Sequence, residues 1–171
     1  STRLPATLEV FDRVWECGRH NVGIVLQAYL YRTPADVERY VARGVNVRLC
    51  KGAYDEPPAV AFPHKPDVDR QFARLTERLL TGGAYTAIAT HDESLIAYAK
   101  AVAAAHAIPP TRFEFQMLHG IRRDLQEALA QQGYRVRIYV PFGLHWYPYF
   151  MRRLAERPAN VLFLARNLIR R

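Results

Sequence analysis

Polar and charged side chains interrupt several apolar segments where a strand of a covered parallel sheet is normally apolar on both faces. Successive strand residues point to opposite faces, so the interrupting residues of each segment share one face. They are Gln27 and Tyr29 in 22–30; Asn46, Arg48 and Cys50 in 45–51; Glu114 and Gln116, with Leu118 on the same face, in 113–118; and Arg135, Arg137 and Tyr139 in 135–140. Buried charges need a partner or a ligand. Two interpretations follow. The polar residues form an internal network of ion pairs and amides, or they line the lumen of a barrel that holds a ligand at its mouth. Because several strands show the same polar face, the second interpretation is favoured.

Two short motifs occur at the ends of expected strands, where active-site residues of α/β folds lie. Lys51-Gly52-Ala53-Tyr54 combines a cation with two small residues. Small residues let the backbone approach a phosphate or a flat ring; the alternative is an ordinary tight turn. Thr90-His91-Asp92 contains a candidate base or metal ligand, His91, and a candidate helix cap, Asp92.

Histidines also follow later expected elements. His91, His119 and His145 would form a metal site if the fold brought them together, which predicts a metal-dependent barrel hydrolase or isomerase as the alternative function. The sequence has no HxH or HExxH spacing in support of it.

Near the C-terminus, Tyr149, Arg152, Arg153 and Glu156 have the spacing of one side of a helix. Two adjacent guanidinium groups suit bidentate capture of a carboxylate, with Glu156 holding one of them in place. The alternative is a basic surface turn on a terminal helix.

The elements that must position these residues alternate between strand and helix. Apolar periodicity predicts strands at 22–30, 45–51, 85–90, 113–118 and 135–140, and helices at 6–17, 33–44, 67–80, 92–107, 121–132, 145–156 and 160–168. Thr33 is the expected cap of the second helix, and the one long connection is the Pro-rich segment 55–66. The pattern is βα repeated five times in a single domain, 1–171. A complete eight-stranded barrel needs about 250 residues.

Composition narrows the function classes. The 171 residues carry 24 Lys and Arg against 16 Asp and Glu, a net charge of +8, but the basic residues are dispersed and no nucleic-acid-binding motif is present. Two cysteines exclude a disulfide scaffold and favour a reducing compartment. No apolar run is long enough to span a membrane. The chain opens Ser-Thr-Arg, without an initiator Met or a signal peptide, so we expect a processed or cut piece.

Five ordered motifs resemble proline dehydrogenases, in particular the monofunctional bacterial kind. They are LQAYL at 26–30, VRLCKGAYDEP at 47–57, ATHD at 89–92, FEFQMLHGIR at 113–122, and RIYVPFG at 137–143 followed by YFMRRLAERPANVLFLARN at 149–167. The resemblance implies an FAD-dependent (β/α)8 barrel that oxidises L-proline to Δ1-pyrroline-5-carboxylate and passes electrons to a membrane quinone. It implies a cytoplasmic protein, with peripheral contact at the inner face of the cytoplasmic membrane as a further expectation.

The resemblance also implies roles for individual residues. Arg48 is similar to the arginine that contacts the flavin near N5, where a cation stabilises negative charge. The other implied FAD contacts are Gln27, Lys51, Gly52, Ala53, Thr90 and His91. Arg152 and Arg153 match the pair that binds the proline carboxylate, with Glu156 positioning them. The residues implied around the proline ring are Leu118, Tyr139, Tyr149 and, less closely matched, Tyr54.

The sequence departs from the family pattern in extent. It supplies five βα units, similar to the fourth to eighth of the family's barrel, and the Lys and Asp that the family contributes from earlier strands have no counterpart. The resemblance therefore implies the C-terminal part of a barrel, which needs the N-terminal half for a complete flavin site.

Overall fold

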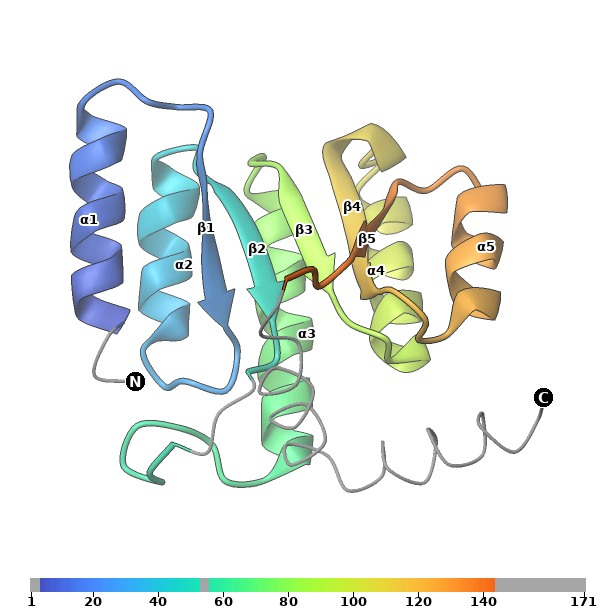
Figure 1. Cartoon of the computed structure of the whole chain (residues 1–171), viewed down its shortest axis with the longest axis horizontal. Helices are drawn as coiled ribbons and strands as arrows, with labels where there is room; N and C mark the ends of the chain where they lie inside the picture. Colours follow the sequence, from blue (N-terminus) through green and yellow to red (C-terminus); the bar gives the residue numbers. More distant parts are fainter. Residues whose placement is uncertain (1–3, 53–55, 144–171) are drawn as a thin grey trace. The chain divides into compact units, whose positions relative to one another are not determined.

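The computed structural model describes residues 4–52 and 56–143 (Figure 1). In chain order the elements are α1 (Leu4–Glu16), β1 (Gly23–Gln27), α2 (Thr33–Ala42), β2 (Asn46–Cys50), α3 (Lys65–Thr81), β3 (Thr86–Ala89), α4 (Glu93–Ala105), the 3₁₀ turn η1 (Pro110–Arg112), β4 (Phe113–Leu118), α5 (Arg123–Gln131) and β5 (Val136–Tyr139). These elements belong to one unit, residues 1–52 and 56–139; residues 53–55 and 140–171 form a second. The expected helices 145–156 and 160–168 lie outside the described residues.

The five strands form one parallel sheet in the order β1-β2-β3-β4-β5. Each strand pairs with the next one in the chain, so the winding never reverses. Right-handed crossovers of this kind place the connecting helices on one face of the sheet, and Figure 1 shows α2, α3 and α4 behind the strands. A doubly wound sheet would reverse direction and carry helices on both faces. The predicted fold class, an incomplete (β/α)8-type barrel, is confirmed.

The core lies between the strands and the helices. Alternate strand residues point to it and are almost fully buried: Ile24, Leu26, Val47, Leu49, Ile88, Phe113, Phe115 and Met117. The helices meet them with apolar faces that include Val37, Tyr40, Phe72, Leu75, Leu79 and Ala99. Full burial of one such aliphatic or aromatic side chain stabilises a fold by about 1.5–3 kcal/mol, so this layer holds the unit together.

One predicted cap is correct and another is wrong. Asp92 caps α4, with its carboxylate accepting a hydrogen bond from the Ser94 N–H at 3.2 Å. Thr33 is the first residue of α2, and its hydroxyl donates to the Gln27 carbonyl at 2.6 Å. Strand β1 ends at Gln27, three residues before the predicted boundary. The residue at the cap position is Arg32, whose guanidinium donates two hydrogen bonds to Asp36.

The described part of the chain contains no helix long and apolar enough to cross a membrane.

Candidate active site

The face of the sheet opposite the helices carries the polar strand residues. The register of the strands places Gln27, Cys50, Ala89, Gln116 and Arg137 in one row across the sheet. The row on its N-terminal side contains Val25, Arg48, Ala87 and Glu114, and the one on its C-terminal side pairs Leu118 with Tyr139. The prediction that these residues share a face is therefore confirmed. We call this the open face.

Hydrogen bonds join the charged residues of the open face. Arg48 donates through Nε to Gln116 Oε1 at 2.6 Å, and Gln116 donates through Nε2 to Glu114 Oε1, also at 2.6 Å. Arg137 donates two further hydrogen bonds to the Glu114 carboxylate, and the Tyr85 hydroxyl donates one more. The internal network of ion pairs and amides, one of the two interpretations of the sequence, is therefore present. A hollow of about 380 Å³ lies over it, with Arg48, Tyr85, Glu114 and Gln116 in its walls.

The charge state of Glu114 follows from these partners. Its side chain is 5% exposed, and burial by itself raises the pKa of a carboxyl group. The hydrogen bonds from Arg137, Gln116 and Tyr85 outweigh burial and hold the pKa of Glu114 below its usual value. Glu114 is therefore an ionised, buried acceptor at neutral pH.

The Thr90-His91-Asp92 motif lies at the C-terminal end of β3, and its side chains are engaged with backbone. Thr90 Oγ1 accepts from the Asp92 N–H at 3.1 Å, and His91 Nε2 accepts from the Leu118 N–H at 2.9 Å. A histidine nitrogen that accepts a hydrogen bond carries no proton. The motif therefore ties the end of β3 to the end of β4.

The histidines of the alternative function do not come together in the described part of the chain. His119 is exposed and His145 lies outside the described residues. No group of three or more His, Cys, Asp or Glu side chains is placed to hold a metal ion within 4–52 and 56–143.

Lys51 lies at the end of β2 and turns toward the helices. Its Nζ lies 2.8 Å from Asp92 Oδ2 and 2.5 Å from Asp69 Oδ1 of α3. The lysine side chain is 11% exposed. Burial by itself raises the pKa values of both carboxyl groups. Hydrogen bonds from Lys51 and Ser94 at Asp92, and from Lys51 and Lys65 at Asp69, outweigh burial. The pKa of each carboxyl group is therefore below its usual value. The sequence did not indicate Asp69 as an ion-pair partner of Lys51. The two carboxylates together bind the ammonium group of Lys51.

Gly52 has a structural reason to be glycine. Its φ is +117°, and a Cβ built there would lie 2.2 Å from the Tyr29 ring. The ring therefore packs directly against the backbone of residue 52. The small residue that the sequence assigns to a cofactor cradle is required here by Tyr29.

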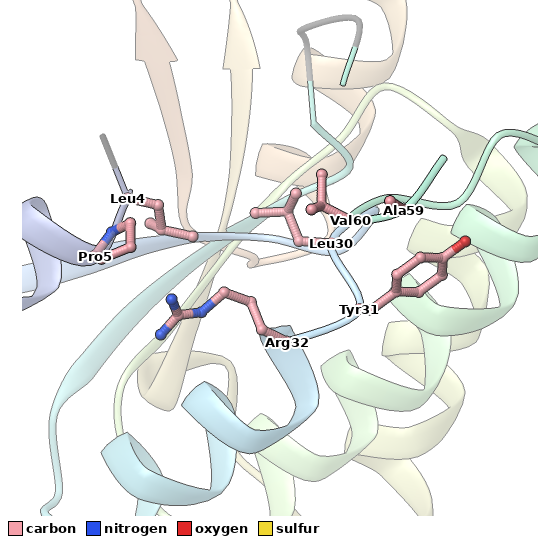
Figure 2. Close-up of a pocket in the computed structure, with 7 residues that line it drawn as sticks. All are labelled: Leu4, Pro5, Leu30, Tyr31, Arg32, Ala59 and Val60. Carbon is pink, nitrogen blue, oxygen red and sulfur yellow. The ribbon is translucent and has the colours of Figure 1, made fainter. Parts of the chain in front are cut away.

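A second hollow, of about 320 Å³, was not foreseen. Figure 2 shows its walls, which come from three separate segments: Leu4 and Pro5; Leu30, Tyr31 and Arg32; Ala59 and Val60. The second and third segments are joined by an antiparallel bridge between Leu30 and Ala61. No spacing within one segment could have indicated it, because each supplies two or three residues.

Several predicted site residues lie outside the described part of the chain: Ala53, Tyr54, Tyr149, Arg152, Arg153 and Glu156. Among those described, the structure brings Gln27, Arg48, Leu118 and Tyr139 to the open face. It directs the Lys51 side chain to the helices instead.

The donor set of the open face fits a flat ring on which negative charge can develop, such as a flavin. Arg48 is half-buried, and its guanidinium pairs with no carboxylate among the described residues, so its positive charge is not cancelled by a contact. Gln27 brings an amide to the neighbouring strand, β1, in the next row. Cation and amide donors beside an open hollow suit the oxygen and nitrogen edge of such a ring.

Comparisons with known proteins place the chain in a family. Residues 1–166 match the proline dehydrogenase family. The chain is 49% identical over 170 residues to the proline dehydrogenase of Deinococcus radiodurans, covering 99% of this chain and 55% of the relative. It is 50% identical over 150 residues to proline dehydrogenase 1 of Bacillus subtilis strain 168, covering 88% of this chain and 50% of the relative.

A solved structure shares the fold. The crystal structure of proline utilization A (PutA) from Bdellovibrio bacteriovorus, inactivated by N-propargylglycine, superposes with a TM-score of 0.79 at 31% identity. The match covers 86% of this chain and 18% of that one. This chain spans about half the length of the curated relatives it matches. The family match over nearly the whole sequence, together with the fold, shows that the chain belongs to the proline dehydrogenase family.

Proposed function

We propose that the protein containing this chain is an FAD-dependent oxidoreductase that converts L-proline to Δ1-pyrroline-5-carboxylate. The observation that carries the proposal is Arg48, a cation on the open face with no carboxylate partner among the described residues, in a chain of this family. FAD, when bound, would supply the acceptor for the hydride that leaves the carbon beside the proline nitrogen.

The residues of the chain would divide the work between binding and electrostatics. Arg48 and Gln27 would contact the flavin from the open face, and Arg48 would stabilise the negative charge that develops there. Gly52 and Ala53 would contribute backbone. Lys51, Thr90 and His91, which the sequence motifs assign to FAD contacts, would also hold the strand ends in place through the contacts described above.

The substrate contacts are proposed from the sequence motifs. Arg152 and Arg153 would bind the proline carboxylate through paired hydrogen bonds, with Glu156 orienting them. Leu118, Tyr139 and Tyr149 would pack around the ring. Fixing the ring in one orientation supplies part of the rate enhancement.

A membrane quinone is the proposed electron acceptor, reached by peripheral contact. The net charge of +8 supports attraction to anionic lipid. We also infer that the 171 residues require the remaining barrel strands for activity, because β1 and β5 are each paired on one side only within the described residues.

The test is the absorbance spectrum of the longest natural protein that carries this sequence, which we call the long form. We expect flavin bands at about 450 nm and proline-dependent reduction of a dye. The 171-residue chain alone should show neither. A purified long form without flavin, or one inert toward proline, contradicts the proposed function, and turnover by the short chain contradicts the requirement for further strands.

The substrate assignment has its own test. Replacing both Arg152 and Arg153 by Ala should raise the KM for proline about a hundredfold while flavin stays bound, because two charge-assisted hydrogen bonds are lost. The matched control replaces Arg19 and Arg123, two exposed arginines, by Ala and should leave the KM unchanged. Equal KM values in the two double variants would remove the carboxylate role.

A further inference from the structure

Gln116 connects the cation of the open face to its buried carboxylate. Arg48 on β2 and Gln116 on β4 are 68 positions apart in the chain and are joined by a hydrogen bond of 2.6 Å. Gln116 is joined in turn to Glu114, its neighbour on the same face of β4, by a second hydrogen bond of 2.6 Å. The amide of Gln116 therefore uses its oxygen for Arg48 and its nitrogen for Glu114.

Small residues on the intervening strand allow this contact. β3 lies between β2 and β4, and it presents Ala87 and Ala89 on the open face. Neighbouring strands are about 4.8 Å apart, so a side chain on β2 must cross about 10 Å to meet one on β4. An arginine and a glutamine together cover that span, provided that nothing larger than a methyl group stands between them.

The orientation of the Gln116 amide is determined by Glu114. An ionised carboxylate only accepts hydrogen bonds, so the amide must turn its NH₂ group toward Glu114. The amide oxygen then faces Arg48, which only donates. Glu114 is itself held by two hydrogen bonds from Arg137 and one from Tyr85, so the amide has a rigid support.

We propose that Gln116, held by Glu114, is the positioning residue for Arg48: it fixes the guanidinium through Nε and leaves the two terminal nitrogens and the full positive charge for the ligand. This inference rests on the proposed function. A neutral amide suits the task because a carboxylate in the same position would orient Arg48 but cancel its charge at the flavin.

Two variants separate orientation from charge. Gln116→Met keeps the volume of the side chain and removes both hydrogen bonds. Gln116→Glu keeps an acceptor for Arg48 but adds a negative charge. The matched control is Gln132→Met, because Gln132 is an exposed glutamine whose oxygen accepts a hydrogen bond from Lys100. All three are made in the long form of the protein, with flavin content and thermal midpoint measured first.

The readouts are steady-state kinetics and the reduction potential of the bound flavin. For Gln116→Met we expect kcat to fall about tenfold with the KM for proline within about twofold, since proline binding does not use Arg48. For Gln116→Glu we expect the reduction potential of the bound flavin to fall by about 30 mV, which is a tenfold change in the equilibrium constant of a two-electron couple. The control variant should match the wild type in both.

The possible results distinguish the proposed function from the positioning role of Gln116. A wild-type protein that binds no flavin overturns the proposed function, and the positioning role falls with it. A wild-type protein that binds flavin and oxidises proline, with Gln116 variants equal to the Gln132 control in kcat and potential, overturns only the positioning role. If Gln116→Met does not fold, the potential of Gln116→Glu decides alone: an unchanged potential contradicts the proposal, and a lowered one supports it.

Discussion

The two faces of the sheet use the same five strands for different purposes. On the face covered by helices, alternate residues of β1 to β4 are nearly inaccessible and, apart from Thr86, apolar, as Leu49 and Phe115 are at 0% exposure. On the open face, the residues between them include Arg48, Glu114 and Gln116, joined by hydrogen bonds. Both faces contain buried residues, since Glu114 is as inaccessible as much of the core.

The difference shows that burial and apolarity are separate requirements. The covered face is stabilised by packing, which tolerates few changes of volume. The open face is stabilised by directed hydrogen bonds. A charged group can be buried there because each of its hydrogen-bond partners is held by a further hydrogen bond. One period-two alternation therefore encodes a core on one side and a candidate site on the other.

The largest effect should come from a cavity on the covered face. Phe115→Ala removes a ring that contacts Phe113 and Tyr134, and we expect the free energy of unfolding to fall by about 4 kcal/mol. Val25→Ala, on the open face at 45% exposure, should cost less than about 1 kcal/mol. Urea unfolding monitored by circular dichroism measures both. Similar losses in the two variants would abolish the distinction between the faces.

The next largest effect should come from Gly52, which follows strand β2. Gly52→Ala should cost about 3 kcal/mol, because it combines an unfavourable φ with a clash against the Tyr29 ring. Gly18→Ala is the control: its φ is +78° with open space around the new Cβ, so it should cost only about 1 kcal/mol. Thermal and urea unfolding compare the two. A Gly52 variant no less stable than the Gly18 variant would show that Tyr29 can move aside.

Lys51 tests whether a charged side chain also stabilises the fold on the side of the helices. Lys51→Met leaves Asp69 and Asp92 without their common partner, and we expect a loss of about 2 kcal/mol at pH 7, less than for a fully buried pair because both carboxylates are partly exposed. Lys65, on the same carboxylates, is 68% exposed, so Lys65→Met is the control and should lose less.

The pH dependence of that loss has a definite sign. The pKa values of Asp69 and Asp92 are lowered in the folded protein, so their contribution is present above the unfolded value of about 4 and is lost as pH falls below it. The difference between wild type and Lys51→Met should therefore shrink between pH 7 and pH 3 in urea unfolding. A difference that grows toward acid pH would contradict the ion-pair account.

The smallest effect belongs to the outer surface. Arg78 donates hydrogen bonds to Glu38 from an exposed position, and burial plays little part in the pair. Arg78→Ala should change the free energy of unfolding by less than about 1 kcal/mol, and salt should reduce even that. Denaturation at low and high salt measures it. A larger, salt-resistant loss would mean that the surface of α3 contributes as much as the Lys51 cluster.

Much of the fold could be predicted from local patterns. Strand β4 has the bounds expected from its alternation, and the five βα repeats follow from apolar periodicity and turn residues. The sharing of one face by Arg48, Glu114 and Gln116 also followed, because a period of two is a property of any strand. The cap at Asp92 was predictable for the same reason: it depends on residues two positions apart.

Other features could not be predicted because they depend on distant partners. Thr33 has the side chain of a helix cap, but the Gln27 carbonyl, six positions away, takes its hydroxyl. Lys51 follows a strand as a ligand-binding lysine would, but Asp92, 41 positions away, takes its ammonium group. Residue type and position along a strand do not say to which side of a turn a long side chain will point.

The alternation and order of the motifs are properties of the chain itself, and they suffice to identify an α/β barrel pattern and its family. Which groups touch is a property of the packed sheet. Arg48 meets Gln116 because the register aligns β2, β3 and β4 and because β3 presents alanines between them. Contacts of that kind depend on strand spacing and side-chain reach, which exist only after the strands have paired.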